Sequence, residues 1–485
     1  MPRLRLLFVV SECVPFAKTG GLADVAGALP IALANRGHDV RIVLPRYRVT
    51  KKHPAKQLPM SIGVPVGRGE AWGGVWETRL GDSAARVYFL DHEELFDRPG
   101  IYNEGSGDYA DNLARFTFLS RGALRLSNAL GFKPDVVHVH DWPTCLAPIY
   151  MKTLEAGTPV GAAASVLSIH NMGYQGWFDK DELYQTGLGW EVFHPRGLES
   201  FDRINLLKGG IYSSTLLSTV SPRYSREIQT AEGGHGLDGA LRERGDSVIG
   251  ILNGIDDEEW NPATDRHLPA HFDERDLRGK AFCKAELQRE MGLPIRPDVP
   301  LIGLISRLVE QKGIDIFAGA LGRVLAEDVQ VVVLGSGEGW AESLFKRLSA
   351  QTDRFRASIG LNEGLAHRIE AGSDLFVMPS RYEPCGLNQL YSQRYGTLPI
   401  VRAVGGLDDT VEHMVTGFKF HALEADVLAD MILSAAHVYR TQPEHFHAMQ
   451  RSAMRKDLGW DHASRQYEAL YRLAISRQVT ARLPG

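Results

Sequence analysis

The chain has 485 residues, and its 54 Lys and Arg against 59 Asp and Glu give a net charge of −5 spread without long runs of one sign. This balance argues against a nucleic-acid-binding surface and against a charged disordered tail. The four cysteines stand far apart with no Cys-x-x-Cys, so neither a zinc site nor a disulfide framework is indicated. The length suits two large α/β domains or three average ones.

The first predicted strand, Leu4–Val10, begins almost at the start of the chain. Arg3 and Arg5 precede it, and the run feeds directly into a glycine-containing loop, which leaves no room for a signal peptide. No apolar run reaches the length of a membrane span. We therefore expect a cytoplasmic protein without a membrane partner.

The loop after this strand reads Lys18-Thr-Gly-Gly-Leu-Ala-Asp-Val and precedes a helical pattern, and the next strand, Val40–Leu44, completes a βαβ unit. Gly20 and Gly21 allow close approach of a ligand to the backbone, helix-start N–H groups attract anions, and Lys18 adds a positive charge. The alternative is that the glycines only make a tight turn. A Walker loop is excluded because Gly-x-x-x-x-Gly-Lys-Ser/Thr does not occur here.

Short apolar runs alternate with helical patterns along the chain, which predicts parallel sheets covered on both faces. The first series continues with Val87–Leu90, Val136–His140, Val166–His170 and Leu217–Val220. The second consists of Leu301–Ser306, Val331–Leu334, Leu375–Met378 and Leu398–Val401. The stretch between them, about Asp246–Pro300, is rich in Asp, Glu, Pro and Arg and contains the turn signal Asn253-Gly254. We place a domain junction there.

Ligands of open α/β sheets bind at the carboxyl ends of strands, so the polar residues there are site candidates. In the first series these are Lys18, His138, His140, Asp141, Trp142, His170 and Asn171. The i, i+2 spacing of His138 and His140 suggests a metal site, but no third ligand is evident nearby, and histidines hydrogen-bonded to backbone are commoner.

The second series ends its first strand in Arg307-Leu-Val-Glu-Gln-Lys312-Gly313. Two cations just beyond a buried strand suit a diphosphate leaving group, whose developing charge they would stabilise. Solvated cations at a helix start are the alternative, which the helix dipole disfavours unless an anion binds. We therefore predict a phosphate site at Arg307 and Lys312.

The strand Leu375–Met378 leads into Glu383-Pro-Cys385-Gly386-Leu387-Asn388, and Gly405-Gly406-Leu-Asp-Asp-Thr410 follows. Together with the Lys18 loop, the His-Asp-Trp and His-Asn placements and Arg-x-x-x-x-Lys, this order resembles bacterial glycogen synthases and plant starch synthases. The resemblance covers essentially the whole chain.

The resemblance implies two facing Rossmann-like doubly wound domains, the GT-B arrangement, with the active site in the cleft between them. It implies an N-terminal domain over 1–250 on the glucan acceptor side and a donor domain over 251–458. A last segment, 459–485, would cross back to the first domain. The apolar positions of this segment fit an amphipathic helix, but the pattern alone does not show which domain it packs on.

The implied activity is retaining transfer of glucose from ADP-glucose to the non-reducing end of an α-1,4-glucan, with no cofactor and no metal. Arg307, Lys312, Glu383 and His170 would act on the reacting groups. Glu383 is left open as nucleophile, as electrostatic stabiliser or as anchor for sugar hydroxyls. The expected substrate-binding residues are Lys18, Gly20, Gly21, Asp24, Asp141, Asn171, Asn253, Leu361, Cys385, Gly386, Leu387, Asn388 and Thr410. Nothing indicates an oligomeric state.

One position departs from the family pattern Gly-Tyr-x-Glu-x-x-x-His, in which the tyrosine resembles a platform for the donor adenine. This chain reads Gly360-Leu361-Asn-Glu363-Gly-Leu-Ala-His367. Leu361 offers apolar contact without a flat π-face, so UDP-glucose as the main donor stays open.

Two other classes of function remain as alternatives. A glucan-binding regulator without catalysis would use the tryptophans concentrated in the first 200 residues, although core tryptophans are commoner. A nucleotide-dependent oxidoreductase would use the loop Gly335-Ser-Gly337-Glu-Gly339, but its glycine spacing fits a dinucleotide fingerprint poorly. A close-packed turn explains these glycines better.

Overall fold

A computed structural model describes residues 2–105 and 107–481, and the chain divides into two compact units. Unit 1 contains the chain up to Val220, Ser225–Ile251 and the chain from Trp460 on. Unit 2 contains Leu252–Gly459 and the short segment Ser221–Tyr224. That segment was not expected in the second domain, because nothing in the sequence interrupts the first one there.

The main sheet of unit 1 has nine strands in the order β14-β13-β9-β8-β1-β2-β5-β4-β3. All neighbours are parallel except β4, which is antiparallel to both β5 and β3. The strands are β1 (Arg5–Val9), β2 (Asp39–Pro45), β3 (Lys56–Val66), β4 (Gly69–Arg79), β5 (Arg86–Asp91), β8 (Val136–His140), β9 (Ala164–Ile169), β13 (Leu216–Thr219) and β14 (Val248–Gly250).

Helices of unit 1 pack on this sheet because its central strands are buried on both faces. They include α1 (Gly21–Asn35), α3 (Asn112–Ala129), α4 (Leu146–Lys152), α5 (Leu206–Ser213), α6 (Pro222–Glu227) in part, α7 (Asp238–Arg244) and α16 (Trp460–Thr480). Two small antiparallel sheets add β6 (Asn103–Glu104) with β7 (Gly107–Asp108), and β10 (Trp177–Asp179) with β12 (Arg203–Asn205) and β11 (Glu199–Ser200).

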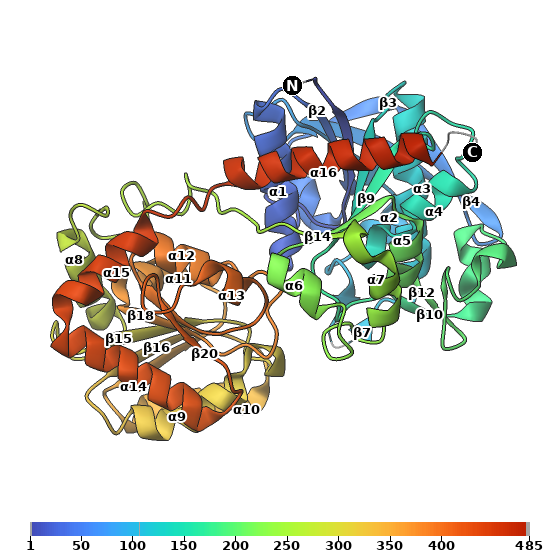
Figure 1. Ribbon diagram of the computed structural model, residues 1–485. Coiled ribbons are helices and arrows are strands. Elements are labelled where there is room, and N and C mark those ends of the chain that lie inside the picture. Colours follow the sequence, from blue (N-terminus) through green and yellow to red (C-terminus); the bar gives the residue numbers. More distant parts are fainter. Residues whose placement is uncertain (1, 106, 482–485) are drawn as a thin grey trace. The chain divides into compact units, whose positions relative to one another are not determined.

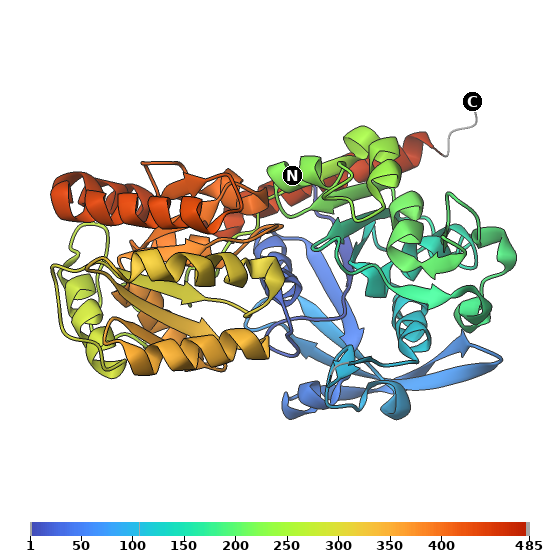
Figure 2. The ribbon, with the colours of Figure 1, turned by 90° about the horizontal axis from the view of Figure 1, so that it is seen from below.

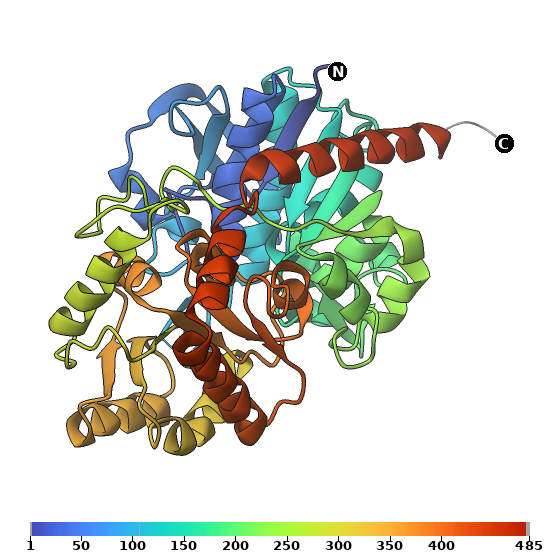
Figure 3. The ribbon, with the colours of Figure 1, turned by 60° about the vertical axis from the view of Figure 1, so that its left-hand side comes forward.

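The C-terminal helix α16 packs on unit 1, where it lies beside α1 (Figures 1 and 3). Its apolar stripe is buried in the same core as β1 and α1. Polar contacts fix it as well: Glu468 binds Arg36 at 2.7 Å and His38 at 2.5 Å, and the Tyr471 hydroxyl lies 2.9 Å from Nδ1 of His138. Helix and sheet therefore share one core despite their separation in sequence.

Unit 2 is built on six parallel strands in the order β17-β16-β15-β18-β19-β20. Helices cover both faces of this sheet, as Figure 2 shows. The strands are β15 (Leu301–Ile305), β16 (Gln330–Gly335), β17 (Phe355–Ile359), β18 (Leu375–Met378), β19 (Leu398–Arg402) and β20 (Phe418–Phe420). The helices are α8 (Arg278–Glu290), α9 (Ile314–Val324), α10 (Gly339–Gln351), α11 (Glu363–Gly372), α12 (Asn388–Arg394), α13 (Gly405–Thr410), α14 (Ala425–Thr441) and α15 (Pro443–Met454).

The predicted α/β class with two doubly wound sheets is confirmed, and each predicted strand forms within one or two residues of its expected bounds. The long β3–β4 hairpin and the edge strands β17 and β20 were not predicted from the sequence. Their burial is mixed along the strand, so they lack the continuous apolar runs that mark the central strands. Among the described residues, no helix combines the length and apolar character needed to cross a membrane.

Candidate functional site

In unit 1 the neighbouring strands β8 and β9 bring Asp141 and His170 together at their carboxyl ends. The Asp141 carboxylate accepts the backbone N–H of His170 at 2.7 Å and also that of Asn171. Asp141 has φ of 52°, an uncommon conformation for a residue with a Cβ. Burial raises the pKa of Asp141 to about 7. Asp141 therefore positions the backbone of His170 and Asn171.

The histidines of these strands form a hydrogen-bonded row in the interior. Nε2 of His170 lies 3.0 Å from Nδ1 of His140, and Nε2 of His138 lies 2.7 Å from the Ser168 hydroxyl. Burial lowers the pKa of His170 to about 3 and lowers those of His138 and His140 well below the usual range. All three rings are neutral at neutral pH, and both nitrogens of His138 have protein partners.

The Lys18 loop forms the turn before α1, but its donors have partners within unit 1. The backbone N–H groups of Thr19 and Gly20, just before the helix, donate to the buried carboxylate of Glu12. The Thr19 and Tyr102 hydroxyls donate to the other Glu12 oxygen at 2.7 and 2.6 Å. Glu12 was not predicted as a site residue, although its place just after the first strand is a signal.

Lys18 and Asp24 also pair with one another in this loop. The Lys18 ammonium lies 2.6 Å from Oδ1 of Asp24, and the lysine side chain is half exposed. Gly21 is the first residue of α1, and a Cβ at Gly20 or Gly21 would meet no atom within 4 Å. The two glycines therefore leave open space at the helix start, which a ligand can approach.

In unit 2 the predicted phosphate residue Lys312 and the predicted catalytic residue Glu383 are in direct contact. The Lys312 ammonium lies 2.6 Å from Oε2 of Glu383, and the Ser380 hydroxyl donates to the same oxygen at 3.0 Å. The Glu383 side chain is 7% exposed and that of Lys312 is 21% exposed. This buried carboxylate and its partly accessible cation form a charged pair at the carboxyl ends of the second sheet.

Glycines allow the two segments to approach one another. Gly313, next to Lys312, has φ of 66°, and a Cβ there would lie 2.0 Å from the carbonyl oxygen of Pro379. Gly405 has φ of 45°, and a Cβ there would lie 1.9 Å from the carbonyl oxygen of Glu383. Each contact brings backbone so close that any side chain would displace it.

The remaining cation, Arg307, is exposed directly after β15, and its guanidinium lies 3.4 Å from the Gln311 side chain. Asn388 begins α12 and donates its amide to the carbonyl of Ile305 at 2.7 Å, which holds the end of β15. Gly386 has φ of 72°, and Leu387 precedes the helix as its N-cap. Arg307 therefore lies on the surface beside a rigidly held strand end.

Cys385, Asn253 and Thr410 lie in the interior behind Glu383. The Cys385 thiol accepts the backbone N–H of Asn253, and burial raises its pKa to about 12. The Thr410 hydroxyl donates to the Gly406 carbonyl at 2.5 Å and accepts from Gln389 at 3.2 Å. These side chains support the loop that carries Glu383 and are buried.

Two loops between strands and helices in unit 2 differ in their packing. Leu361, which follows β17, is 96% exposed. The Gly335 loop is close-packed, since a Cβ at Gly335 or Gly337 would lie 1.9 Å from the Ser306 carbonyl oxygen or 2.4 Å from that of Leu308. This agrees with the interpretation of the Gly335 loop as a close-packed turn.

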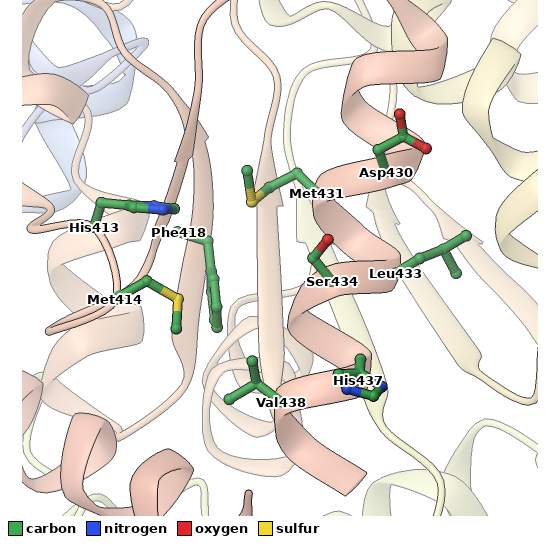
Figure 4. Close-up of a pocket in the computed structure, with 9 residues that line it drawn as sticks. All are labelled: His413, Met414, Phe418, Asp430, Met431, Leu433, Ser434, His437 and Val438. Atoms are coloured by element: carbon green, nitrogen blue, oxygen red, sulfur yellow. The ribbon is translucent and has the colours of Figure 1, made fainter. Parts of the chain in front are cut away.

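A surface pocket of about 610 Å³ lies elsewhere in unit 2, beside α14 and β20 (Figure 4). Its lining residues are His413, Met414, Phe418, Asp430, Met431, Leu433, Ser434, His437 and Val438. None of them is a predicted site residue, and none comes from the carboxyl ends of β15 or β18. The pocket therefore contains no residue of the predicted site.

Comparison with known proteins identifies the family. The starch synthase catalytic domain matches residues 5–243, and the family of glycosyl transferases group 1 matches residues 290–452. Glycogen synthase 1 of Geobacter sulfurreducens is 51% identical over 99% of this chain and 98% of its own length. Glycogen synthase of Treponema denticola is 45% identical over 98% of this chain and 100% of its own length.

A solved structure also supports this family assignment. The catalytic domain of Starch Synthase IV from Arabidopsis thaliana, bound to ADP and acarbose, has a TM-score of 0.91 and 34% identity, covering 98% of this chain and 100% of that one. Sucrose-phosphate synthase from Thermosynechococcus elongatus, 15% identical with a TM-score of 0.60, shares the fold. The chain belongs to the glycogen and starch synthase family of glycosyltransferases, as its sequence motifs indicate.

Proposed function

We propose that this chain transfers glucose from ADP-glucose to the non-reducing end of an α-1,4-glucan with retention of configuration. The observation that carries the proposal is the buried Glu383 carboxylate in contact with Lys312, just beyond the sheet edge where Arg307 also lies. Family membership supports it, as does the relative from Arabidopsis thaliana that was solved bound to ADP and acarbose.

Arg307 and Lys312 are the proposed ligands of the donor diphosphate. Breaking the bond between glucose and phosphate places negative charge on the leaving oxygens, and fixed cations lower the energy of that transition state. Lys312 is the more exposed member of its pair with Glu383. Its ammonium can therefore contact a bound diphosphate while it remains close to Glu383. Arg307 supplies planar donors that match phosphate oxygens in pairs.

Glu383 then stays beside the sugar as a fixed negative charge. Its carboxylate accepts from both Ser380 and Lys312, which holds it in one orientation. A held anion next to an oxocarbenium-like centre stabilises positive charge, and the same oxygens can accept sugar hydroxyls. We favour these two roles over nucleophilic attack by Glu383.

His170 is proposed to contact the donor glucose, with Asp141 and Asn171 around it. The neutral His170 ring can donate a hydrogen bond to a sugar hydroxyl or accept one from it, without introducing a second charge. Asp141 keeps the His170 backbone in place. Lys18 and Asp24 are proposed to contact substrate after their mutual ion pair opens, and Gly20 and Gly21 leave room for it.

The test is glucose incorporation into glycogen from ADP-glucose and UDP-glucose, measured side by side. The proposal predicts incorporation from ADP-glucose with an α-linked product. No incorporation from either donor would favour the alternative, a glucan-binding regulatory protein. Faster turnover with UDP-glucose would assign that donor instead and would fit the exposed leucine at position 361.

A further inference from the structure

A second cluster in unit 2, formed by Glu259, Glu363 and His367, shares no residue with the proposed transferase site. One possible ligand atom from each of the three lies within 4.8 Å of those of the other two. Glu259 follows the turn at Asn253, and Glu363 is the first residue of α11. Among the described residues, this is the one group of His, Cys, Asp and Glu with metal-ligand proximity.

A hydrogen bond and ring stacking hold the side chain of His367, the histidine of this cluster, as they hold metal-binding histidines. Its Nδ1 lies 2.7 Å from Oδ2 of Asp265, and the Tyr395 hydroxyl donates to the same oxygen at 2.5 Å. The Trp260 ring stacks on the His367 ring at 3.8 Å with an angle of 11° between the planes. Metal-binding histidines characteristically donate their second ring N–H to a carboxylate, which fixes the tautomer and the ring.

The other ring nitrogen has no partner. His367 is fully buried, and its Nε2 makes no hydrogen bond to any described residue. When the ring is neutral and Nδ1–H is donated to Asp265, as in a metal-bound histidine, Nε2 carries a lone pair that can bind an ion. An acceptor buried without a partner costs free energy, and a cation supplies the missing partner.

The two glutamates supply the charge. Both side chains belong to exposed residues, so they can move toward an ion without disturbing the core. Ligands in a tetrahedral zinc site at about 2.1 Å from the ion stand about 3.4 Å apart, so closing from the observed spacing needs only small side-chain rotations. Two carboxylates and one neutral imidazole would balance a divalent cation.

We propose that Glu259, Glu363 and Nε2 of His367 form a binding site for a divalent transition-metal ion of the zinc type, with Asp265 orienting the histidine. A mixed imidazole and carboxylate set suits Zn²⁺ better than Mg²⁺ or Ca²⁺, which prefer oxygen ligands alone. Three protein ligands leave the fourth position to water. The bound ion joins the segment around Glu259 to the start of α11.

The experiment is Zn²⁺ titration of the EDTA-stripped, dialysed full-length protein by calorimetry. A Glu259→Gln/Glu363→Gln variant removes two ligands from the surface and leaves the buried histidine in place. A Glu258→Gln/Glu444→Gln variant is the matched control, because it removes the same charge from two exposed glutamates outside the cluster. Co²⁺ absorption in the visible range reports the coordination geometry.

We expect one Zn²⁺ per chain with submicromolar Kd, a higher Tm with Zn²⁺ present, and tetrahedral-type Co²⁺ bands. The ligand-site variant should bind at least tenfold more weakly and lose the Tm response, while the control should match the wild type. Equal Zn²⁺ affinity in both double variants, or no binding at micromolar Zn²⁺, would overturn the proposal. Neither result depends on transferase activity.

Discussion

The ammonium of Lys312 lies 2.6 Å from Oε2 of Glu383, although the two residues come from loops after different strands of unit 2. Gly313 and Gly405 make this contact possible, since the backbone of each packs against the segment from Pro379 to Glu383. A cation proposed for phosphate and a carboxylate proposed for the sugar are thus one charged pair. Removing either member changes the electrostatics of the other.

For Lys312→Ala we expect kcat to fall by about 10² or more, because a charge that stabilises the leaving diphosphate is lost. The variant also leaves the buried Glu383 without its cation, so its Tm should drop. Steady-state kinetics with ADP-glucose measure the first effect and thermal unfolding the second. Lys346→Ala, at an exposed position of α10, is the control. A raised KM with kcat unchanged would assign Lys312 to binding alone.

For Arg307→Ala the expected loss in kcat is similar in size, and Arg307→Lys should recover only part of it. Lysine keeps the charge but not the planar pair of donors that a phosphate accepts. Tm should hardly change in either variant, because Arg307 is exposed and its nearest side-chain contact is the 3.4 Å one to Gln311. Full activity in the lysine variant would show that charge alone matters at this position.

For Cys385→Ser we expect most of the activity to remain. The thiol is buried and its pKa is raised to about 12, so it is not a thiolate at neutral pH. A serine hydroxyl can accept the same Asn253 backbone N–H. Mass spectrometry of the enzyme mixed with ADP-glucose gives an independent check, and a glucosyl group on Cys385 would contradict this view.

For Leu361→Tyr we predict a KM for ADP-glucose lower by several-fold to about tenfold, with a smaller effect for UDP-glucose. Stacking of a base on an aromatic ring is worth roughly 1–3 kcal/mol in nucleic-acid complexes, and leucine provides no such face. The side chain is 96% exposed, so the larger ring fits without a clash in the ligand-free protein. Leu361→Met is a size control without a ring. An unchanged KM in the tyrosine variant would remove Leu361 from the donor site.

For Glu370→Gln we predict a change in how stability depends on pH. Burial raises the pKa of Glu370 from 4.5 to about 8, and the Ser392 hydroxyl donates to its Oε2 at 2.8 Å. The proton bound in the folded state stabilises it fully below pH 4.5, and this contribution is lost as pH rises through 8. Glutamine cannot titrate, so its advantage over the wild type should grow with pH.

Thermal unfolding at pH 5 and pH 9 measures this effect. We expect the Tm advantage of the glutamine variant over the wild type to be several degrees larger at pH 9 than at pH 5, because this shift in pKa corresponds to up to about 4 kcal/mol between the two pH values. Glu444→Gln on the exposed face of α15 should show no such trend. A constant Tm difference at both pH values would mean that Glu370 does not titrate in this range.

The positions of the central strands along the chain and the candidate side chains at their ends could be predicted because each rests on a local pattern. Buried parallel strands are continuous apolar runs, so β8, β15 and β18 were found close to their observed bounds. Edge strands such as β17 were missed because partial burial removes that signal. Glu12 was missed because its hydrogen bonds come from the folded Lys18 loop, and a single carboxylate in the sequence gives no sign of them.

The sequence by itself determined the fold class, the family and the residues that carry charge near the strand ends, since motif spacing and hydrophobic pattern are properties of the chain. Only the tertiary structure decided which of these groups meet. It paired Lys312 with Glu383 and Lys18 with Asp24, turned the Gly20 N–H toward Glu12, and left Nε2 of His367 without a partner. The physical reason is that hydrogen bonds and ion pairs form over a few ångströms between residues far apart in the chain, and packing alone brings them within that range.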